Sequence, residues 1–507
     1  MFNPSANRCA KAFLPFAIFI FAFLTRFCYI SLGPYHLDCL TLAIKSTETL
    51  QTHQLQYLFG SGYPLVVILG SLFVFIFQIF GGNDPVIAVN FMSVVFGALG
   101  AWMFFLLIRK IDSEMTALVG ALLFCVSPIL WGTSVFGMSH SPSLFFLLTS
   151  LYFLFSFLET SERKMLFIAA IAMGLMGSSR LHDMIVMIVP VSYLVLSNDD
   201  GRCSIKTCRE RFGVWVQFLL IASVVVVLFH MPYFMNHVQE NYKHQWSDYW
   251  YLGLSSNFRG LWSEYLTLSL SFLKDNYTLM GLIFVLGGFV IMMREKRRLA
   301  VFLSLWFLVF FFFFGNLSTV VPRFFVVMIP SLIVFQAYAL VFMFDRGQQM
   351  RWWAMGILIV LMVMQASVIL PGIMYRHEQS AIKEFSTWVG QVTEGHARVI
   401  AGDENPFISY YGRRSSMTRP SCAVTCSQEE LEVFRGQVDG WLKSATPVYM
   451  TNTALLADNP NGEFKNFMEK YYQLDYVGEH FMEDWHQDGF HFRVGYEKLF
   501  RIVVKEK

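Results

Sequence analysis

The strongest constraint on this chain is a series of apolar stretches, each long enough to form a helix that crosses a membrane. A helix of about 20 apolar residues spans the hydrocarbon core of a bilayer. The chain is also 55% hydrophobic and only 15% charged, with a mean hydropathy of +0.49. The sequence therefore predicts a polytopic α-helical membrane protein with about eleven transmembrane helices. The predicted spans are 12–32, 85–108, 116–137, 141–158, 165–179, 181–197, 212–232, 277–293, 299–315, 324–344 and 352–372.

The positions of the basic residues predict which ends of these helices face the cytoplasm. Basic clusters lie at Arg8/Lys11, Arg109/Lys110, Arg163/Lys164, Arg202–Arg211, Arg294–Arg298 and Arg346/Arg351. Cytoplasmic loops carry an excess of Lys and Arg, and all six clusters fall on one side only if residues 63–80 do not cross. We therefore expect an interfacial or re-entrant helix at 63–80, a cytoplasmic N-terminus and an external C-terminus. Loops 33–62 and 233–276 are then external.

The sequence changes character after residue 372, which predicts a membrane module over 1–372 and an external domain over 373–507. The tail mixes polar and aromatic residues and contains short strand-like and helical patterns, which together predict a small α/β domain. The predicted elements are helices at Ile382–Val389 and Glu463–Tyr472, and strands at Ala397–Ala401, Pro447–Thr451 and Leu499–Val504. Cys422 and Cys426 either form a disulfide in this domain or do not, and both alternatives are open.

Composition excludes several functional classes. The formal net charge is +2 and no basic patch suits a nucleic acid, so we expect no nucleic-acid partner. The eight cysteines show no C-x-x-C or zinc-type spacing, which argues against a metal knuckle. Arg8 and Lys11 precede an apolar stretch without a small-residue cleavage site, which favours an uncleaved anchor helix over a signal peptide.

Asp38 is the main candidate for chemistry. It lies in the stretch Gly33-Pro-Tyr-His-Leu-Asp38, directly after the first apolar span. Beyond the Gly-Pro break, apolar and polar residues occupy opposite helical faces, which predicts a helix in the membrane interface with Asp38 facing water. The simpler alternative is an ordinary solvated acid.

Ionisable residues at two helix breaks are further candidates. Arg180 and His182 flank a break between two apolar helices. A functional role is the default interpretation of ionisable residues at such depth in a membrane. The alternative is an internal Arg180–Asp183 ion pair. Arg323 follows a proline at a helix start, where it could contact phosphate or extend to the interface. His140 lies in the external turn 137–142.

The external loop 233–276 is rich in aromatic residues, with Lys243 and Arg259 among them. Aromatic residues are enriched at membrane interfaces, so an interfacial belt is one interpretation. Sugars also stack on aromatic rings, so a cover over a glycosyl phosphate is the other.

With these segments in order, the chain resembles the GT-C superfamily of membrane glycosyltransferases, and within it the protein O-mannosyltransferase and aminoarabinose-transferase group. The resemblance covers nearly the whole chain, although each motif is short. The motifs are Leu24-Thr-Arg26-Phe followed by Gly33–Asp38, Gly60-Ser-Gly-Tyr63-Pro-Leu65, Gly174–Arg180, and Val321-Pro-Arg323 through Pro330. The tail resembles the α/β extension that many bacterial members carry, which implies a bacterial inner (plasma) membrane.

The resemblance implies transfer of a sugar from a polyprenyl-phosphate donor to a lipid, glycan or protein acceptor on the external face. Asp38 would be the general base, because a base must remove the proton of the acceptor hydroxyl. Arg323 would neutralise the leaving phosphate. Arg180, His182, His140, Lys243, Arg259 and Tyr63 complete the predicted substrate-binding set.

Two departures from the family pattern bear on metal binding. The family usually has two adjacent acids at the first motif, where this chain has Asp38-Cys39, and often an acid at the second external turn, where this chain has His140. A divalent metal is therefore a possible cofactor but not an assured one, and we assign no metal ligand.

Two other functions remain as alternatives. A transporter or flippase of lipid-linked sugars should show paired halves or ionisable groups inside the bundle. Here the polar residues gather in the external loops, and no internal duplication is visible. The second alternative is a structural subunit of a membrane complex that docks through its tail.

Overall fold

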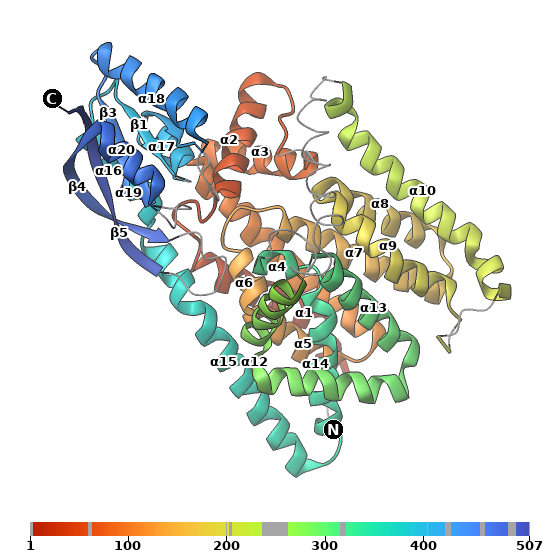
Figure 1. Ribbon diagram of the computed structural model, residues 1–507. Helices are drawn as coiled ribbons and strands as arrows, with labels where there is room; N and C mark the ends of the chain where they lie inside the picture. Colours follow the sequence, from red (N-terminus) through yellow and green to blue (C-terminus); the bar gives the residue numbers. More distant parts are fainter. Residues whose placement is uncertain are drawn as a thin grey trace. The chain divides into compact units, whose positions relative to one another are not determined.

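The structure is a computed structural model (Figure 1). It describes residues 4–58, 63–198, 200–201, 205–235, 262–314, 321–402, 404–420, 427–456, 462–484 and 493–505. The chain divides into two compact units. Of the described residues, the first unit comprises those in 4–31 and 41–377, and the second comprises those in 32–40 and 378–505.

The first unit is helical, and its helices are those of a multi-pass integral membrane protein. Six helices of the described residues are long and apolar enough to cross a membrane, and further apolar helices are shorter. The helices are α1 (Pro4–Phe27), α2 (Leu37–Thr52), α3 (Pro64–Ile79), α4 (Pro85–Ile111), α5 (Glu114–Val126), α6 (Pro128–Thr133), α7 (His140–Thr160), α8 (Arg163–Ser179), α9 (Leu181–Leu196), α10 (Ile205–Met235), α12 (Trp262–Glu295), α13 (Arg297–Phe314), the 3₁₀ helix η1 (Pro322–Phe325), α14 (Ile329–Phe344) and α15 (Gln348–Glu378). Helix α2 begins in the second unit and continues into the first.

The predicted span at 116–137 forms two helices, α5 and α6, and not one continuous helix. Pro128 has no N–H and cannot continue the hydrogen-bond ladder of α5. Ser127, before the proline, leaves the helical region with φ −58° and ψ 122°. Asn276 of α12 stabilises the break: its Oδ1 accepts hydrogen bonds from the Ser127 hydroxyl (2.8 Å) and the Ile129 amide (3.0 Å).

Two polar residues of α4 fix the turn that precedes α7. The Asn90 amide donates to the Ser31 carbonyl (2.9 Å), and its oxygen accepts from the Gly137 N–H at 2.6 Å. One turn later, the Ser93 hydroxyl accepts from the Met138 N–H at 3.1 Å. Both side chains are buried, so no water could take their place as hydrogen-bond partners of these backbone groups. This turn sets where α7, and with it His140, begins.

The second unit contains a five-stranded mixed sheet with helices packed against it, in blue in Figure 1. The strand order is β2-β1-β3-β5-β4, with β1, β2 and β3 parallel and β5 antiparallel to both of its neighbours. The elements are α16 (Ala381–Val392), β1 (Arg398–Ala401), α17 (Asn405–Tyr411), β2 (Ser415–Thr418), α18 (Gln428–Lys443), β3 (Val448–Thr451), α19 (Asn452–Leu456), α20 (Glu463–Tyr471), β4 (Tyr472–Asp484) and β5 (Arg493–Val504).

The predicted strands at 397–401, 447–451 and 499–504 correspond to β1, β3 and part of β5, and the two predicted tail helices correspond to α16 and α20. The sequence did not predict β2 and β4. All four residues of β3 are buried, as expected for a central strand of a sheet with helices packed on it. Side chains of α18 and α20 form one core with the strands, centred on Phe434, Phe464 and Met450. The Cys422–Cys426 alternative lies outside the described residues.

Candidate functional site

The candidate site begins at a one-residue break between α8 and α9. Arg180 occupies this break with an extended backbone (φ −155°, ψ 96°), so it ends α8 and precedes the first turn of α9. Its N–H still donates to the Met176 carbonyl at 2.7 Å. Asp183 lies in the first turn of α9, where the helix dipole favours a carboxylate. Three residues of one short segment, Arg180, His182 and Asp183, therefore present ionisable groups in the helical unit.

The Arg180 guanidinium is the centre of a buried polar cluster. Its Nε donates to Asp183 Oδ2 at 2.9 Å, and the side chains of the pair are only 4% and 0% exposed. Its Nη1 lies 2.6 Å from His140 Nε2 and donates to the Ser139 hydroxyl at 3.3 Å. Its Nη2 lies 2.7 Å from His182 Nε2. The predicted internal Arg180–Asp183 pair is thus present, and two histidines join it.

These contacts determine the form of the two imidazoles. A guanidinium only donates hydrogen bonds, so the Nε2 atoms of His140 and His182 must be acceptors. Each imidazole is then neutral and carries its proton on Nδ1. Arg180 uses four of its five N–H donors in this way, and within the described residues one N–H on Nη2 has no partner.

Asp183 is held by a second helix. Its Oδ2 also accepts a hydrogen bond from the Ser143 hydroxyl of α7 at 2.8 Å. Both His140 and Ser143 belong to the first turn of α7, which the Asn90 and Ser93 contacts position. The cluster therefore joins α7 to the α8–α9 corner. Its members are buried except for Ser139 and His182, which are partly buried.

Aromatic rings surround the two histidines. His182 stacks on Phe313 (ring centroids 6.4 Å apart, 14° between planes) and meets the edges of Phe314 and Tyr63. His140 stacks on Phe324 with centroids 6.4 Å apart. These rings lower the polarity around the histidines, which strengthens the polar contacts among them, while the His182 side chain stays 21% exposed.

Tyr63 and Arg323 are connected to the cluster through these rings. Tyr63 precedes α3 with φ 43° and ψ 48°, a left-handed conformation that is strained for a residue with a side chain. Arg323, in η1, lies with its guanidinium carbon 5.7 Å from the centroid of the Phe324 ring, which also stacks on His140 and Phe314. The structure thus brings together Arg180, His182, His140, Tyr63 and Arg323 of the predicted set.

Asp38 lies in the first turn of α2, as the sequence predicts. Its carboxylate is 3.3 Å from His36 Nδ1 and the side chain is 29% exposed. The Asp38 N–H donates to the same His36 Nδ1 at 3.2 Å, so that nitrogen is an acceptor. The imidazole therefore places its proton on Nε2, and the carboxylate stays partly exposed.

Lys243 and Arg259 lie outside the described residues. Within the described part of the chain, no group of three or more His, Cys, Asp or Glu residues could hold a metal ion. The sequence reasoning did not include Ser139, Ser143 and the phenylalanine wall among the site residues. Ser143 carries no local signal, and Phe313 and Phe314 are hidden within an uninterrupted aromatic run at 310–314.

Comparisons with known proteins agree with this architecture. Residues 67–231, about a third of the chain, match the family described as dolichyl-phosphate-mannose-protein mannosyltransferase. The fold matches ArnT from Cupriavidus metallidurans bound to undecaprenyl phosphate with a TM-score of 0.61 and 14% identity, over 97% of this chain and 98% of that one. No curated protein sequence matches the chain.

A second group of solved structures also matches. The Archaeoglobus fulgidus oligosaccharyltransferase, solved in complex with Zn and sulfate, matches with a TM-score of 0.57 and 14% identity, over 94% of this chain and 72% of that one. The archaeal oligosaccharyltransferase AglB from the same organism, in complex with an inhibitory peptide and a dolichol-phosphate, matches with a TM-score of 0.54 and 14% identity, over 96% and 74%.

The fold is therefore like that of ArnT and AglB. The resemblance predicted from the sequence is confirmed to this extent: residues 67–231 match the mannosyltransferase family model, and the fold matches these solved membrane proteins.

Proposed function

We propose that this protein is an integral-membrane glycosyltransferase that moves a sugar from a polyprenyl-phosphate donor to an acceptor on the external face of the membrane. The observation that carries the proposal is the buried Arg180 cluster, in a fold that aligns along 97% of this chain with a protein solved with undecaprenyl phosphate. The sugar and the class of acceptor (lipid, glycan or protein) are for substrate assays to identify.

The leaving phosphate needs cations that are already oriented. As the glycosidic C–O bond breaks, negative charge develops on the phosphate oxygen, and charge-assisted hydrogen bonds from a guanidinium stabilise it. Arg180 has one N–H to offer, and His140 and His182 hold its plane in place. Arg323, which also contacts the Phe324 ring, supplies the second positive charge.

The acceptor hydroxyl needs a base, and Asp38 is the candidate. An ionised carboxylate can take the hydroxyl proton as the new C–O bond forms on the face opposite the phosphate. Asp38 is partly exposed, and the hydrogen bond from its N–H to His36 Nδ1 fixes its place in the first turn of α2. The competing interpretation remains a solvated acid, which predicts no loss of rate on substitution.

Transfer of a radiolabelled sugar from polyprenyl-phosphate-sugar tests the proposal with purified full-length protein. Asp38→Asn should keep its fold and lose about 10²–10⁴-fold in rate, the usual effect of removing a positioned base. Asp38→Glu should keep only part of the parental rate, because the additional methylene displaces the carboxylate. Glu48→Gln is the matched control: Glu48 belongs to the same helix, and among the described residues its carboxylate pairs only with Lys45 (2.7 Å).

The result separates the candidate roles. A folded Asp38→Asn protein with parental activity would remove Asp38 from the mechanism. A parent protein that binds the donor lipid and transfers no sugar to any membrane extract would overturn the transferase proposal and favour a flippase.

We also propose the orientation that the basic loops predict. The N-terminus is cytoplasmic, about eleven helices span the membrane and the second unit is external. Residues 63–80 do not cross, although α3 forms a helix there. Single cysteines at position 82 and in the tail should react with an impermeant reagent in intact cells, and protection of the tail would contradict the orientation.

A further inference from the structure

A cavity of 640 Å³ lies where the ends of five helices of the first unit meet. The last turns of α4, α7, α9 and α12 and the first turn of α13 form its walls. Its lining residues fall into a charged set, Lys110, Glu159, Asp200, Arg294, Glu295, Lys296, Arg297 and Arg298, and an apolar set, Ile111, Phe155, Leu158, Leu194 and Leu299. The charged set has a formal excess of two positive charges.

Part of this charge is used within the protein. Lys110 forms an ion pair with Glu159, and Lys296 forms one with Asp112, which lies outside the lining. The Arg298 guanidinium donates to the Leu194 carbonyl at 2.6 Å, at the end of α9. These three cations have structural partners.

Two exposed arginines that line the cavity, Arg294 and Arg297, form no ion pair with any other described residue. Arg294 lies in the last turn of α12, where the helix dipole tolerates a cation. Arg297 is the first residue of α13, where the dipole opposes one, and the first turn of α13 contains no acid. An anion in the cavity would relieve this imbalance.

We propose that this cavity binds a phosphate group, with the headgroup of an anionic phospholipid of the cytoplasmic leaflet as its source. Basic pockets between transmembrane helices on the cytoplasmic side are suited to anionic headgroups. All six basic clusters of the sequence fall on that side in the proposed orientation. The apolar part of the lining, which includes Phe155 and Leu158, suits the glycerol and the start of the acyl chains. A free phosphate compound of the cytosol shares the same chemistry.

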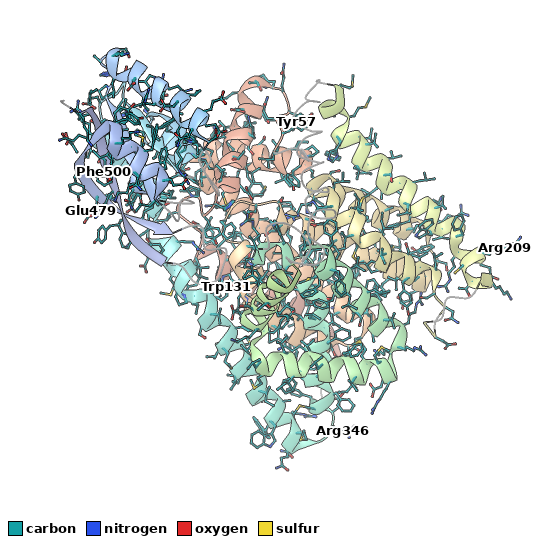
Figure 2. All side chains as sticks on the ribbon, in the orientation of Figure 1. Tyr57, Trp131, Arg209, Arg346, Glu479 and Phe500 are labelled. Carbon is teal, nitrogen blue, oxygen red and sulfur yellow. The ribbon has the colours of Figure 1, made fainter. Side chains whose placement is uncertain are left out.

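The test compares two paired variants of the full-length protein, delipidated in detergent and analysed by native mass spectrometry. Arg294→Gln/Arg297→Gln removes the two cations of the cavity. Arg346→Gln/Arg351→Gln removes two exposed cations elsewhere, at the turn between α14 and α15 where Figure 2 labels Arg346. The probes are phosphatidylglycerol, phosphatidylcholine and inorganic phosphate.

The parent should retain phosphatidylglycerol in preference to phosphatidylcholine. An arginine near the headgroups contributes about fivefold to binding, so the cavity variant should bind phosphatidylglycerol roughly 30-fold more weakly, while the control variant binds it like the parent. If inorganic phosphate alone binds with the same dependence on Arg294 and Arg297, the phosphate site stands and its source is soluble. Parental binding by the cavity variant, or an equal loss in the control variant, would overturn the proposal.

This outcome does not depend on catalysis. An inactive Asp38→Asn protein should bind phosphatidylglycerol like the parent, so failure of the transferase proposal and failure of the phosphate site are separate results.

Discussion

Replacing Asp183 with alanine tests the physical basis of the candidate site most directly. Asp183 is fully buried and is the counter-ion of Arg180, whose side chain is only 4% exposed. Its Oδ2 accepts hydrogen bonds from both Arg180 Nε (2.9 Å) and the Ser143 hydroxyl (2.8 Å). Alanine would leave the guanidinium buried without a counter-ion and the hydroxyl without its acceptor.

The expected loss follows from these contacts. Removing one partner of a buried ion pair costs about 3–5 kcal/mol, because the other charge stays buried and uncompensated. The orphaned Ser143 hydroxyl adds roughly 1 kcal/mol. Asp183→Asn keeps an oxygen for both donors and loses only the charge, so we expect a smaller loss of about 1.5–3 kcal/mol. The expected order of stability is parent, then Asp183→Asn, then Asp183→Ala.

The assay is unfolding of the full-length protein in mixed micelles, followed by tryptophan fluorescence. Glu162→Ala is the control, because Glu162 lies next to α8, pairs with Lys164 (2.9 Å), and both side chains are exposed. Such a pair should contribute less than about 1 kcal/mol. A second control, Arg180→Met/Asp183→Leu, removes both charges and should be more stable than Asp183→Ala.

Two results would refute the reasoning. Asp183→Ala could lose no more stability than Glu162→Ala, which would mean that the pair is not desolvated. Alternatively, the double variant could be less stable than Asp183→Ala, which would mean that an unpaired buried guanidinium is not the source of the loss.

Three further predictions concern the phosphate contact, the second unit and the α7 turn. Arg323→Ala should weaken use of the donor about 10–150-fold, the equivalent of one charge-assisted hydrogen bond of roughly 1.5–3 kcal/mol; unchanged kcat/KM for the donor would assign the phosphate to other residues. Burial, and then the nearby Glu404 carboxylate, raise the pKa of Glu497 from 4.5 to about 7. The neutral form is favoured on folding, so this contribution is complete below pH 4.5 and is lost as the pH rises through about 7. Glu497→Gln should therefore be more stable than the parent by roughly 3 kcal/mol at pH 8 and lack the part of the pH dependence between 4.5 and 7 that Glu497 contributes, measured by thermal or denaturant unfolding followed by the β-sheet circular dichroism signal; the same pH dependence in both proteins would contradict it. Gly137→Ala would place a Cβ 2.5 Å from Val89 Cγ2 and 3.0 Å from its backbone carbonyl carbon, so we expect a loss of about 1–3 kcal/mol in the micelle assay, and parental stability would contradict the turn packing.

The sequence alone determines where the helices lie and which residues are candidates for chemistry. The predicted spans 85–108 and 141–158 correspond closely to α4 and α7. Hydropathy and proline placement are local properties, and they act the same way whatever the rest of the chain does. The same holds for Asp38, whose place in the first turn of an amphipathic helix follows from the residues around it.

Only the tertiary structure decides which of these groups meet. His140 and Arg180 are 40 residues apart, as are Ser143 and Asp183, and no local pattern connects them. Their contact depends on how α7 packs against α8, which Asn90 controls from a third helix through the Gly137 turn. The sequence left Arg180 with two interpretations, an internal ion pair or a ligand contact. The guanidinium pairs with Asp183 and still has one N–H without a partner among the described residues. The packing therefore allows both the internal ion pair and a contact with a ligand.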